Sequence, residues 1–152
     1  MTRSKNNHLP GQLEEATYVA ILRAADSLSQ LPDQIIKGAG LTSAQYNVLR
    51  ILRGAGPEGL PCNVIAERMI SRDPDMTRML DRMEKRDLIT RQRQKDDRRV
   101  IKARVTEEGL KLLKKLDTPI RDAHKEQFHH IGPARLKSLS QLLDELGKRE
   151  SS

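Results

Sequence analysis

The feature that most constrains the fold is the stretch Ser71–Thr106, where a helical pattern of apolar residues is followed at once by two strand-like patterns. Four residues recur at helical spacing and predict a helix over Asp73–Arg86 with one buried face: Met76, Met79, Leu80 and Met83. We expect Asp73 to cap this helix and Pro74 to take its first position, where a missing N–H costs nothing. The opposite face carries Arg78, Asp81, Arg82 and Lys85.

Two short segments after this helix alternate in polarity with period two. They are residues 89–93 and 100–105, and a polar turn, QKDDRR, separates them. Such alternation with β-branched residues predicts two half-buried strands joined as a hairpin. A helix followed directly by a hairpin is the layout of a winged helix, in which the helix enters the DNA major groove and the hairpin reaches the backbone or minor groove.

The distribution of charge agrees with a nucleic-acid partner. Residues 68–104 hold 13 Lys and Arg against 7 Asp and Glu, which accounts for +6 of the net charge of +7. For an arbitrary charge run a solvated surface is the better interpretation, but here the charge coincides with the helix and hairpin. The three aromatic residues, Tyr18, Tyr46 and Phe128, lie outside this segment, which argues against a stacking platform for single strands or RNA.

The flanking segments predict five further helices. An apolar stripe over Gly11–Leu31 predicts a first helix that Pro32 should end or kink. Thr42 and Gln45 form a capping box for a second helix, Leu60 is expected to add a short strand to the hairpin, and Pro61 opens a third helix. Thr106 is expected to cap a fifth helix, and Gly132-Pro133 begins a sixth with a face of five leucines: Leu136, Leu139, Leu142, Leu143 and Leu146.

Several of these segments resemble the MarR family of multiple-antibiotic-resistance regulators. The family's D-x-R wing signature and T-x-x-G helix start match Asp97-Arg98-Arg99 and Thr106–Gly109. Its L-T-x-x-Q-x-x-x-L and L-A-x-x patterns match LTSAQYNVL at 41–49 and IAERM at 65–69. The four motifs stand in the family's order, and the resemblance covers about Leu13 to Leu146. Asp87 departs from the family's usual glycine at a position expected to need a left-handed backbone, which Asp tolerates better than most residues.

The resemblance implies a mainly α fold with a small β-hairpin wing: a winged helix-turn-helix of about six helices, with a helical dimerisation region built from both termini. The chain is then one domain, 1–152, with a DNA-binding lobe at 41–105 and dimerisation segments at 11–38 and 106–150. We expect a homodimer that binds a near-palindromic operator on double-stranded DNA. Most members of the family are repressors, so repression is the expected effect. A small-molecule effector is expected between the lobe and the dimer helices.

Roles for individual residues follow from the helix geometry and the resemblance. Arg78 is expected to read a base edge and Thr77 to contact a phosphate or a thymine methyl. Asp75 either accepts from a cytosine amino group or favours the helix N-terminus, and the second role is preferred slightly. Arg72 and Arg82 are expected on phosphates. In the wing, Arg99 matches the family arginine that enters the minor groove, and Asp97 matches the acid that orients this arginine. Arg98 is expected to follow the DNA backbone.

The sequence also contains candidates for other functions. Cys62 at the start of the third helix is a candidate redox site, because a helix N-terminus lowers a thiol pKa, but it occupies an apolar position of the family pattern. His124, His129 and His130 lack metal-site spacing, so we expect no metal and no cofactor. A winged-helix protein-interaction or assembly module remains the rival from another class. No enzyme motif is present.

The sequence also indicates in which cellular compartment the protein is expected. The single cysteine fits a reducing cytosol, the N-terminus lacks the apolar core of a signal peptide, and no apolar run approaches the roughly 20 residues of a membrane span. We therefore expect a cytoplasmic protein without a membrane partner.

Overall fold

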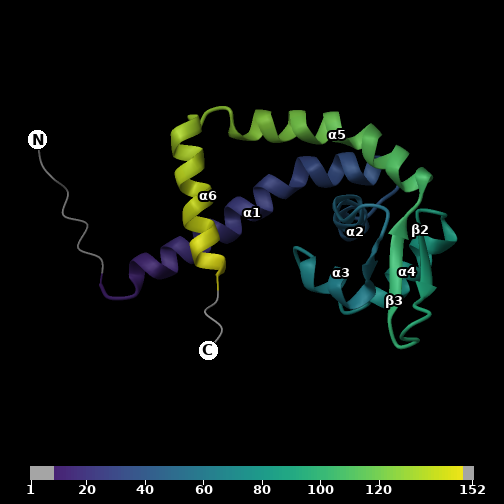
Figure 1. Cartoon of the computed structure of the whole chain (residues 1–152). Helices are drawn as coiled ribbons and strands as arrows, with labels where there is room; N and C mark the ends of the chain where they lie inside the picture. The colour runs from purple at the N-terminus through teal and green to yellow at the C-terminus, as the bar shows by residue number, and fades with distance from the viewer. Residues whose placement is uncertain (1–8, 149–152) are drawn as a thin grey trace, which may run out of the picture.

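The computed structural model describes residues 9–148 and shows six helices with a small three-stranded antiparallel sheet (Figure 1). The predicted mainly α fold with a hairpin wing is confirmed. Two long helices extend from a compact lobe and a third lies at their far end (Figure 1). In chain order the elements are α1 (Gln12–Gly38), α2 (Ser43–Ala55), β1 (Leu60–Pro61), α3 (Cys62–Arg68), α4 (Met76–Lys85), β2 (Ile89–Arg93), β3 (Ile101–Val105), α5 (Glu107–Phe128) and α6 (Pro133–Gly147).

Helix α2 runs through the centre of the lobe. The predicted capping box is present: the Thr42 hydroxyl accepts from the Gln45 amide at 3.1 Å, and the Gln45 side chain accepts from the Thr42 amide at 3.1 Å. With its start fixed, α2 buries one face completely, and the core collects around it from α3, α4 and α5. The side chains that are fully buried there include Val48, Leu49, Leu52, Ile65, Met83 and Leu113.

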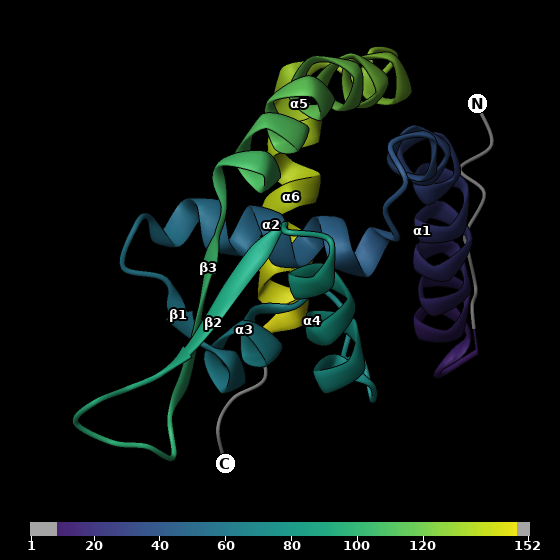
Figure 2. The ribbon, with the colours of Figure 1, turned by 90° about the vertical axis from the view of Figure 1, so that its right-hand side faces the viewer.

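The sheet has the order β1-β3-β2, so the hairpin of β2 and β3 carries the short strand β1 on its outer edge. The predicted pairing of Leu60 with the hairpin is confirmed, with Ala103 as its partner, and Ile89 pairs with Val105. Ala103 and Ile89 are buried while Arg104 and Thr90 are exposed, so the hairpin rests one face on the lobe. The turn between the strands projects away from the lobe (Figure 2).

The hairpin and α5 meet at a tight junction. The Thr106 hydroxyl accepts from the Gly109 amide at 3.0 Å, which is the predicted cap, and donates to the Asp87 carbonyl at 2.6 Å. A Cβ on Gly109 would lie 2.5 Å from the Leu88 carbonyl oxygen, so any larger residue would push the two segments apart. The end of the α4 segment is therefore fixed directly to the start of α5.

Pro32 does not end the first helix, contrary to one of the two outcomes expected for it. Helix α1 runs through it to Gly38, and Pro32 itself is buried. A proline leaves the carbonyl four residues earlier without its helical partner. Here that carbonyl, on Leu28, accepts from Gln127 Nε2 of α5 at 2.8 Å, so a distant side chain replaces the missing bond.

Helix α6 and the first two-thirds of α1 contribute little to the core. None of the residues of α6, all within the described part, is buried, and α1 buries only Pro32 and Ile36. Large apolar side chains on both helices are exposed instead, among them Leu13, Tyr18 and Leu22 on α1, and Leu142, Leu143 and Leu146 on α6. The expected dimerisation segment 106–150 ends two residues beyond the described range. No helix within residues 9–148 is long and apolar enough to cross a membrane.

Candidate nucleic-acid interface

The structure corrects the expected start of the α4 helix. The sequence predicted Asp73 as the cap and Pro74 as the first helical residue, but α4 begins at Met76. Asp73 Oδ1 accepts from the Asp75 amide at 2.8 Å, which forms a local turn over Pro74 instead of a cap. Asp75 stands at the cap position without a side-chain cap bond, and its carboxylate lies 3.8 Å from Arg78 Nε.

The two faces of α4 differ as predicted. Met79, Leu80 and Met83 are buried against the lobe. The residues facing outward are exposed and mostly basic, and they include four candidate DNA contacts, Asp75, Thr77, Arg78 and Arg82, together with Lys85. Arg72, in the connection before the helix, is also exposed. All the candidate contacts of this segment are therefore exposed to solvent.

The end of α4 has the left-handed residue that the sequence predicted. Asp87 has φ of 59°, and the Leu88 amide donates back to the Met83 carbonyl at 3.0 Å. This is a helix stop that usually has glycine at the left-handed position. It turns the chain sharply into β2, so the hairpin begins immediately beside α4.

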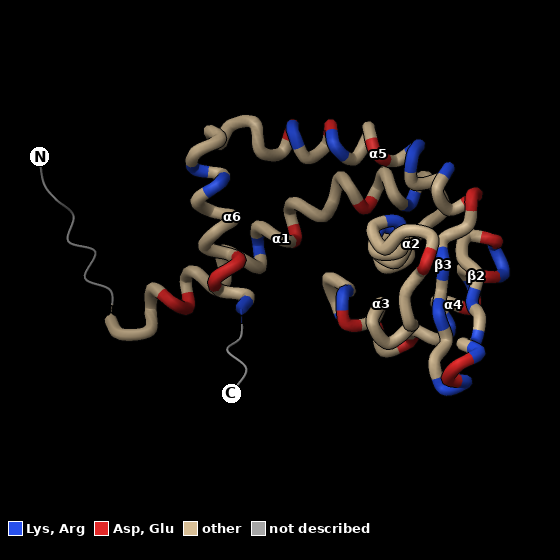
Figure 3. The backbone as a smooth tube through the Cα atoms, viewed as in Figure 1, with Lys and Arg blue, Asp and Glu red and all other residues tan. Residues whose placement is uncertain are grey.

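The wing turn places Asp97, Arg98 and Arg99 at an exposed tip. Asp97 Oδ1 accepts from the Arg99 backbone amide at 3.1 Å, and the Val100 amide donates to the Asp97 carbonyl at 3.0 Å. Asp97 thus shapes the backbone from which Arg99 projects, and within the described residues it forms no ion pair with the Arg99 guanidinium. Lys and Arg positions gather along the hairpin and its tip (Figure 3).

A partly buried ion-pair cluster joins the hairpin to α4. The Arg91 guanidinium on β2 contacts Asp81 and lies 3.2 Å from Glu84, both on α4, and Glu84 also accepts from the Arg91 amide at 2.8 Å. The Arg91 side chain is only 19% exposed. Burial acts to lower the pKa of Arg91, but hydrogen bonds and charge attraction from the two carboxylates outweigh it and raise the pKa above its ordinary value.

Sequence reasoning missed this cluster, although a signal existed. Arg91 shares the strand face of Ile89, which was expected to be buried, so an arginine on that face needed an acidic partner. From the sequence, Asp81 is placed only on the outward face of the helix, and Glu84 is given no role. The cluster sets the angle between the helix and the wing, the two elements that carry the candidate DNA contacts.

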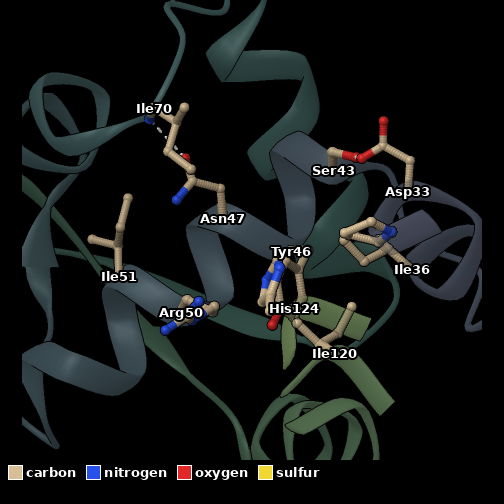
Figure 4. Close-up of a pocket in the computed structure, with 11 residues that line it drawn as sticks. Asp33, Ile36, Ser43, Tyr46, Asn47, Arg50, Ile51, Ile70, Ile120 and His124 are labelled. Carbon is tan, nitrogen blue, oxygen red and sulfur yellow. Dashed lines mark hydrogen bonds between the residues drawn. The ribbon is translucent and has the colours of Figure 1, made fainter. Parts of the chain in front are cut away.

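A cavity of about 440 Å³ lies between the lobe and the long helices (Figure 4). Its walls are apolar at Ile36, Ile51 and Ile120 and polar at Arg50 and His124. The Arg50 guanidinium carbon lies 5.9 Å from the centroid of the Tyr46 ring. The remaining lining residues are Pro32, Asp33, Ser43, Asn47 and Ile70.

Cys62 is partly buried, and His129 and His130 lie next to each other. Burial raises the pKa of the Cys62 thiol above its ordinary value, with the positive charge of Arg91 opposing the rise. A raised pKa lowers the thiolate fraction, so the structure favours the apolar interpretation of Cys62 over the redox one. His129 and His130 stack edge to face at 5.8 Å, and no group of three potential ligands gathers within residues 9–148.

Comparisons with known proteins agree with this geometry. Residues 41–101 match the model of the MarR family. A MarR transcription factor from Planctomyces limnophilus is 34% identical, with a TM-score of 0.68 over 92% of this chain and 98% of that one. The homoprotocatechuate degradative operon repressor of Escherichia coli is 26% identical over 133 residues, 88% of each chain. A variant of MarR from E. coli, complexed with operator DNA, has the same fold at 18% identity. The TM-score is 0.80, and the match covers 93% of this chain and 100% of that one.

The exposed basic helix, the adjoining wing and the helix-turn-helix connection define a winged-helix DNA-binding transcription regulator. Within that class, the chain belongs to the MarR family.

The Arg91 cluster generates a stability prediction. Arg91→Leu leaves two carboxylates on α4 without their partner. Because Asp81 and Glu84 are 46% and 41% exposed and can regain water, the free energy of unfolding should fall by about 0.5–1.5 kcal/mol, the net range for a hydrogen bond. Urea denaturation followed by circular dichroism measures the change. Arg68→Leu is the matched control, because Arg68 is exposed at the end of α3, and surface changes usually stay within about 0.5 kcal/mol. Equal losses in the two variants would contradict a structural role for the cluster.

Proposed function

We propose that this protein represses transcription as a homodimer, with α4 of each protomer in a major groove and each wing in the flanking minor groove. The observation that carries the proposal is the exposed basic face of α4, which continues into the wing and is backed by the buried Met79, Leu80 and Met83. The name of the E. coli relative supports repression. Two-fold symmetry then requires a near-palindromic operator with half-sites about one helical turn apart.

Each candidate contact has a role in this arrangement. Arg78 reads a base edge, because arginine can bind guanine through two hydrogen bonds, and Thr77 contacts a phosphate or a thymine methyl. Arg72 and Arg82 hold phosphates. Asp75, 3.8 Å from Arg78, serves mainly to favour the helix N-terminus and to orient that arginine. In the wing Arg99 enters the minor groove, Arg98 follows the backbone, and Asp97 holds the turn.

A salt titration separates this function from that of a protein-interaction module with the same fold. Binding to a random duplex should be measurable at low salt. The logarithm of the binding constant should fall linearly with the logarithm of the salt concentration, because Lys and Arg displace counterions from phosphates. Absence of binding at low salt would favour the interaction module. Selection of bound sequences from a random duplex library then yields the operator for the experiments below.

The wing gives a direct test. Arg99→Ala should weaken binding to every duplex by about 1–3 kcal/mol, because a minor-groove arginine acts through charge and groove shape. Fluorescence anisotropy on the selected operator and on a random duplex measures both losses. Arg78→Ala is the comparison variant: if Arg78 reads a base, preference should flatten at one symmetric pair of positions. Unchanged affinity for Arg99→Ala at moderate salt would remove the wing from the interface.

The dimer surface is proposed from the exposed apolar faces of α1 and α6, which belong to segments 11–38 and 106–150. Leu142 is 63% exposed and Leu146 66%, on a helix with no buried residue of its own. Exposed apolar faces of this extent indicate an interaction surface. Because the two helices come from the two ends of the chain, a two-fold contact through them would leave both DNA-binding lobes free.

Charge on the leucine face should break this dimer. Leu142→Glu places two unpaired carboxylates in the interface, and burying such a group costs several kcal/mol, enough to dissociate an ordinary dimer. Light scattering should show a monomer or aggregate, and affinity for a full operator should fall far more than for a half-site. Gln141→Glu, on the opposite face of α6, is the matched control and should remain dimeric. A wild-type monomer of 17.3 kDa at micromolar concentration would refute the surface.

The cavity between the lobe and the long helices is proposed as the effector site. Apolar walls with an arginine at the rim suit an aromatic acid, whose ring meets Ile51 and Ile120 and whose carboxylate meets Arg50. The operon for which the E. coli relative is named supplies a probe, homoprotocatechuate. Calorimetry should show binding that Arg50→Gln weakens about ten-fold or more, because a charge-assisted hydrogen bond is lost. Arg23→Gln, exposed on α1, is the control; equal affinity in all three proteins would refute the role of Arg50.

A further inference from the structure

A single side chain ties α2 to the connection between α3 and α4. Asn47, in the middle of α2, accepts the backbone N–H of Ile70 on its Oδ1 at 2.8 Å, although the two residues are 23 positions apart (Figure 4). Asn47 is half-buried, while the Ile70 side chain is 88% exposed. The bond therefore joins the central helix of the lobe to a segment that has little packing of its own.

This connection determines where α4 begins. It runs from Met69 to Asp75, between the end of α3 and the first residue of α4. Within the connection, Asp73 holds the Asp75 amide at 2.8 Å. In the described part of the chain, the bond from Asn47 is the only hydrogen bond between this connection and an element other than the two helices that it joins. Loss of that bond would leave the connection held mainly by the two helices that it joins.

The same bond forms part of the cavity wall. Asn47 and Ile70 both line the cavity of about 440 Å³, and both line a second hollow of about 360 Å³ together with Ala44, Met69 and Ser71. Ile70 stands between these two hollows. Both partners of the bond that holds the α3–α4 connection therefore line both hollows.

We propose that Asn47 is a positioning residue for DNA recognition: through the Ile70 amide it fixes the α3–α4 connection and so the placement of α4 in the major groove. The proposal rests on the proposed role of α4 in DNA binding. Placement matters most for contacts to base edges, which require alignment, and little for phosphate contacts, which follow from charge. Asn47 therefore acts on the difference between operator and random DNA.

The test compares two substitutions that differ in one acceptor. Asn47→Leu has a similar size and no acceptor, whereas Asn47→Asp keeps an oxygen for the Ile70 amide. The measured quantity is the ratio of affinity for the selected operator to affinity for a random duplex, which cancels the charge that Asp adds. Loss of one hydrogen bond should lower this ratio roughly 3- to 10-fold in Asn47→Leu and leave it within two-fold in Asn47→Asp. Gln34→Leu, an exposed amide on α1, is the matched control.

A second measurement observes the bond itself. Hydrogen exchange of the Ile70 amide, followed by NMR on the free protein, should be faster in Asn47→Leu and near the wild-type rate in Asn47→Asp. The salt slope on random duplex should stay equal in all variants, which a general loss of folding would not allow. Asn47→Ala serves in place of Asn47→Leu if circular dichroism shows that the leucine variant is unfolded.

The outcomes separate this proposal from the function on which it rests. A wild-type ratio in Asn47→Leu, or an equal loss in Asn47→Leu and Asn47→Asp, overturns the positioning role. If wild-type protein shows no preference for any duplex, the proposed function fails, and the exchange rate of Ile70 still decides whether Asn47 holds the connection. An exchange rate that is the same in Asn47→Leu and wild-type protein would overturn the tether itself.

Discussion

The orientation of the DNA-binding elements depends on one half-buried charge. Arg91 lies on the inner face of β2 and is held by Asp81 and Glu84 on α4, so the hairpin cannot tilt without separating a guanidinium from two carboxylates. The Arg91 side chain is only 19% exposed, so loss of its carboxylate partners would cost free energy, and the cluster therefore favours one angle between helix and wing. Thr106 and Gly109 then extend the same rigid unit into α5. The start of α5 is thus held next to the end of α4 and the hairpin.

Features that depend on neighbours in the chain could be predicted from the sequence. The capping box at Thr42, the cap at Thr106 and the left-handed Asp87 each involve residues within three or four positions. The hairpin and its partner Leu60 also followed from local alternation and turn residues. These elements together give the winged-helix fold, because their order along the chain allows few other arrangements.

Features that depend on distant partners could not be predicted. Pro32 was expected to end or kink its helix. The helix continues through it, and Gln127, 99 residues away along the chain from Leu28, bonds to the free carbonyl. Asp73 is a different case: it was expected to cap α4, but its carboxylate accepts from an amide only two residues along, so two local uses of one side chain competed. The bond from Asn47 to Ile70 spans 23 residues and gives no periodic signal. Roles of the individual DNA-contacting residues remain predictions, since they depend on a partner molecule that no intrachain contact specifies.

The exposed face of helix α6 has a consequence for the lifetime of this protein at different concentrations. It contains four leucines that are at least 39% exposed and has no buried residue, so packing within its own chain stabilises this helix little. An isolated helix of 15 residues is only marginally stable in water. If a second copy covers that face, as proposed, the order of α6 is set by mass action. Newly made protein at low abundance would then be the form most open to proteolysis, and its lifetime would lengthen as its concentration rises.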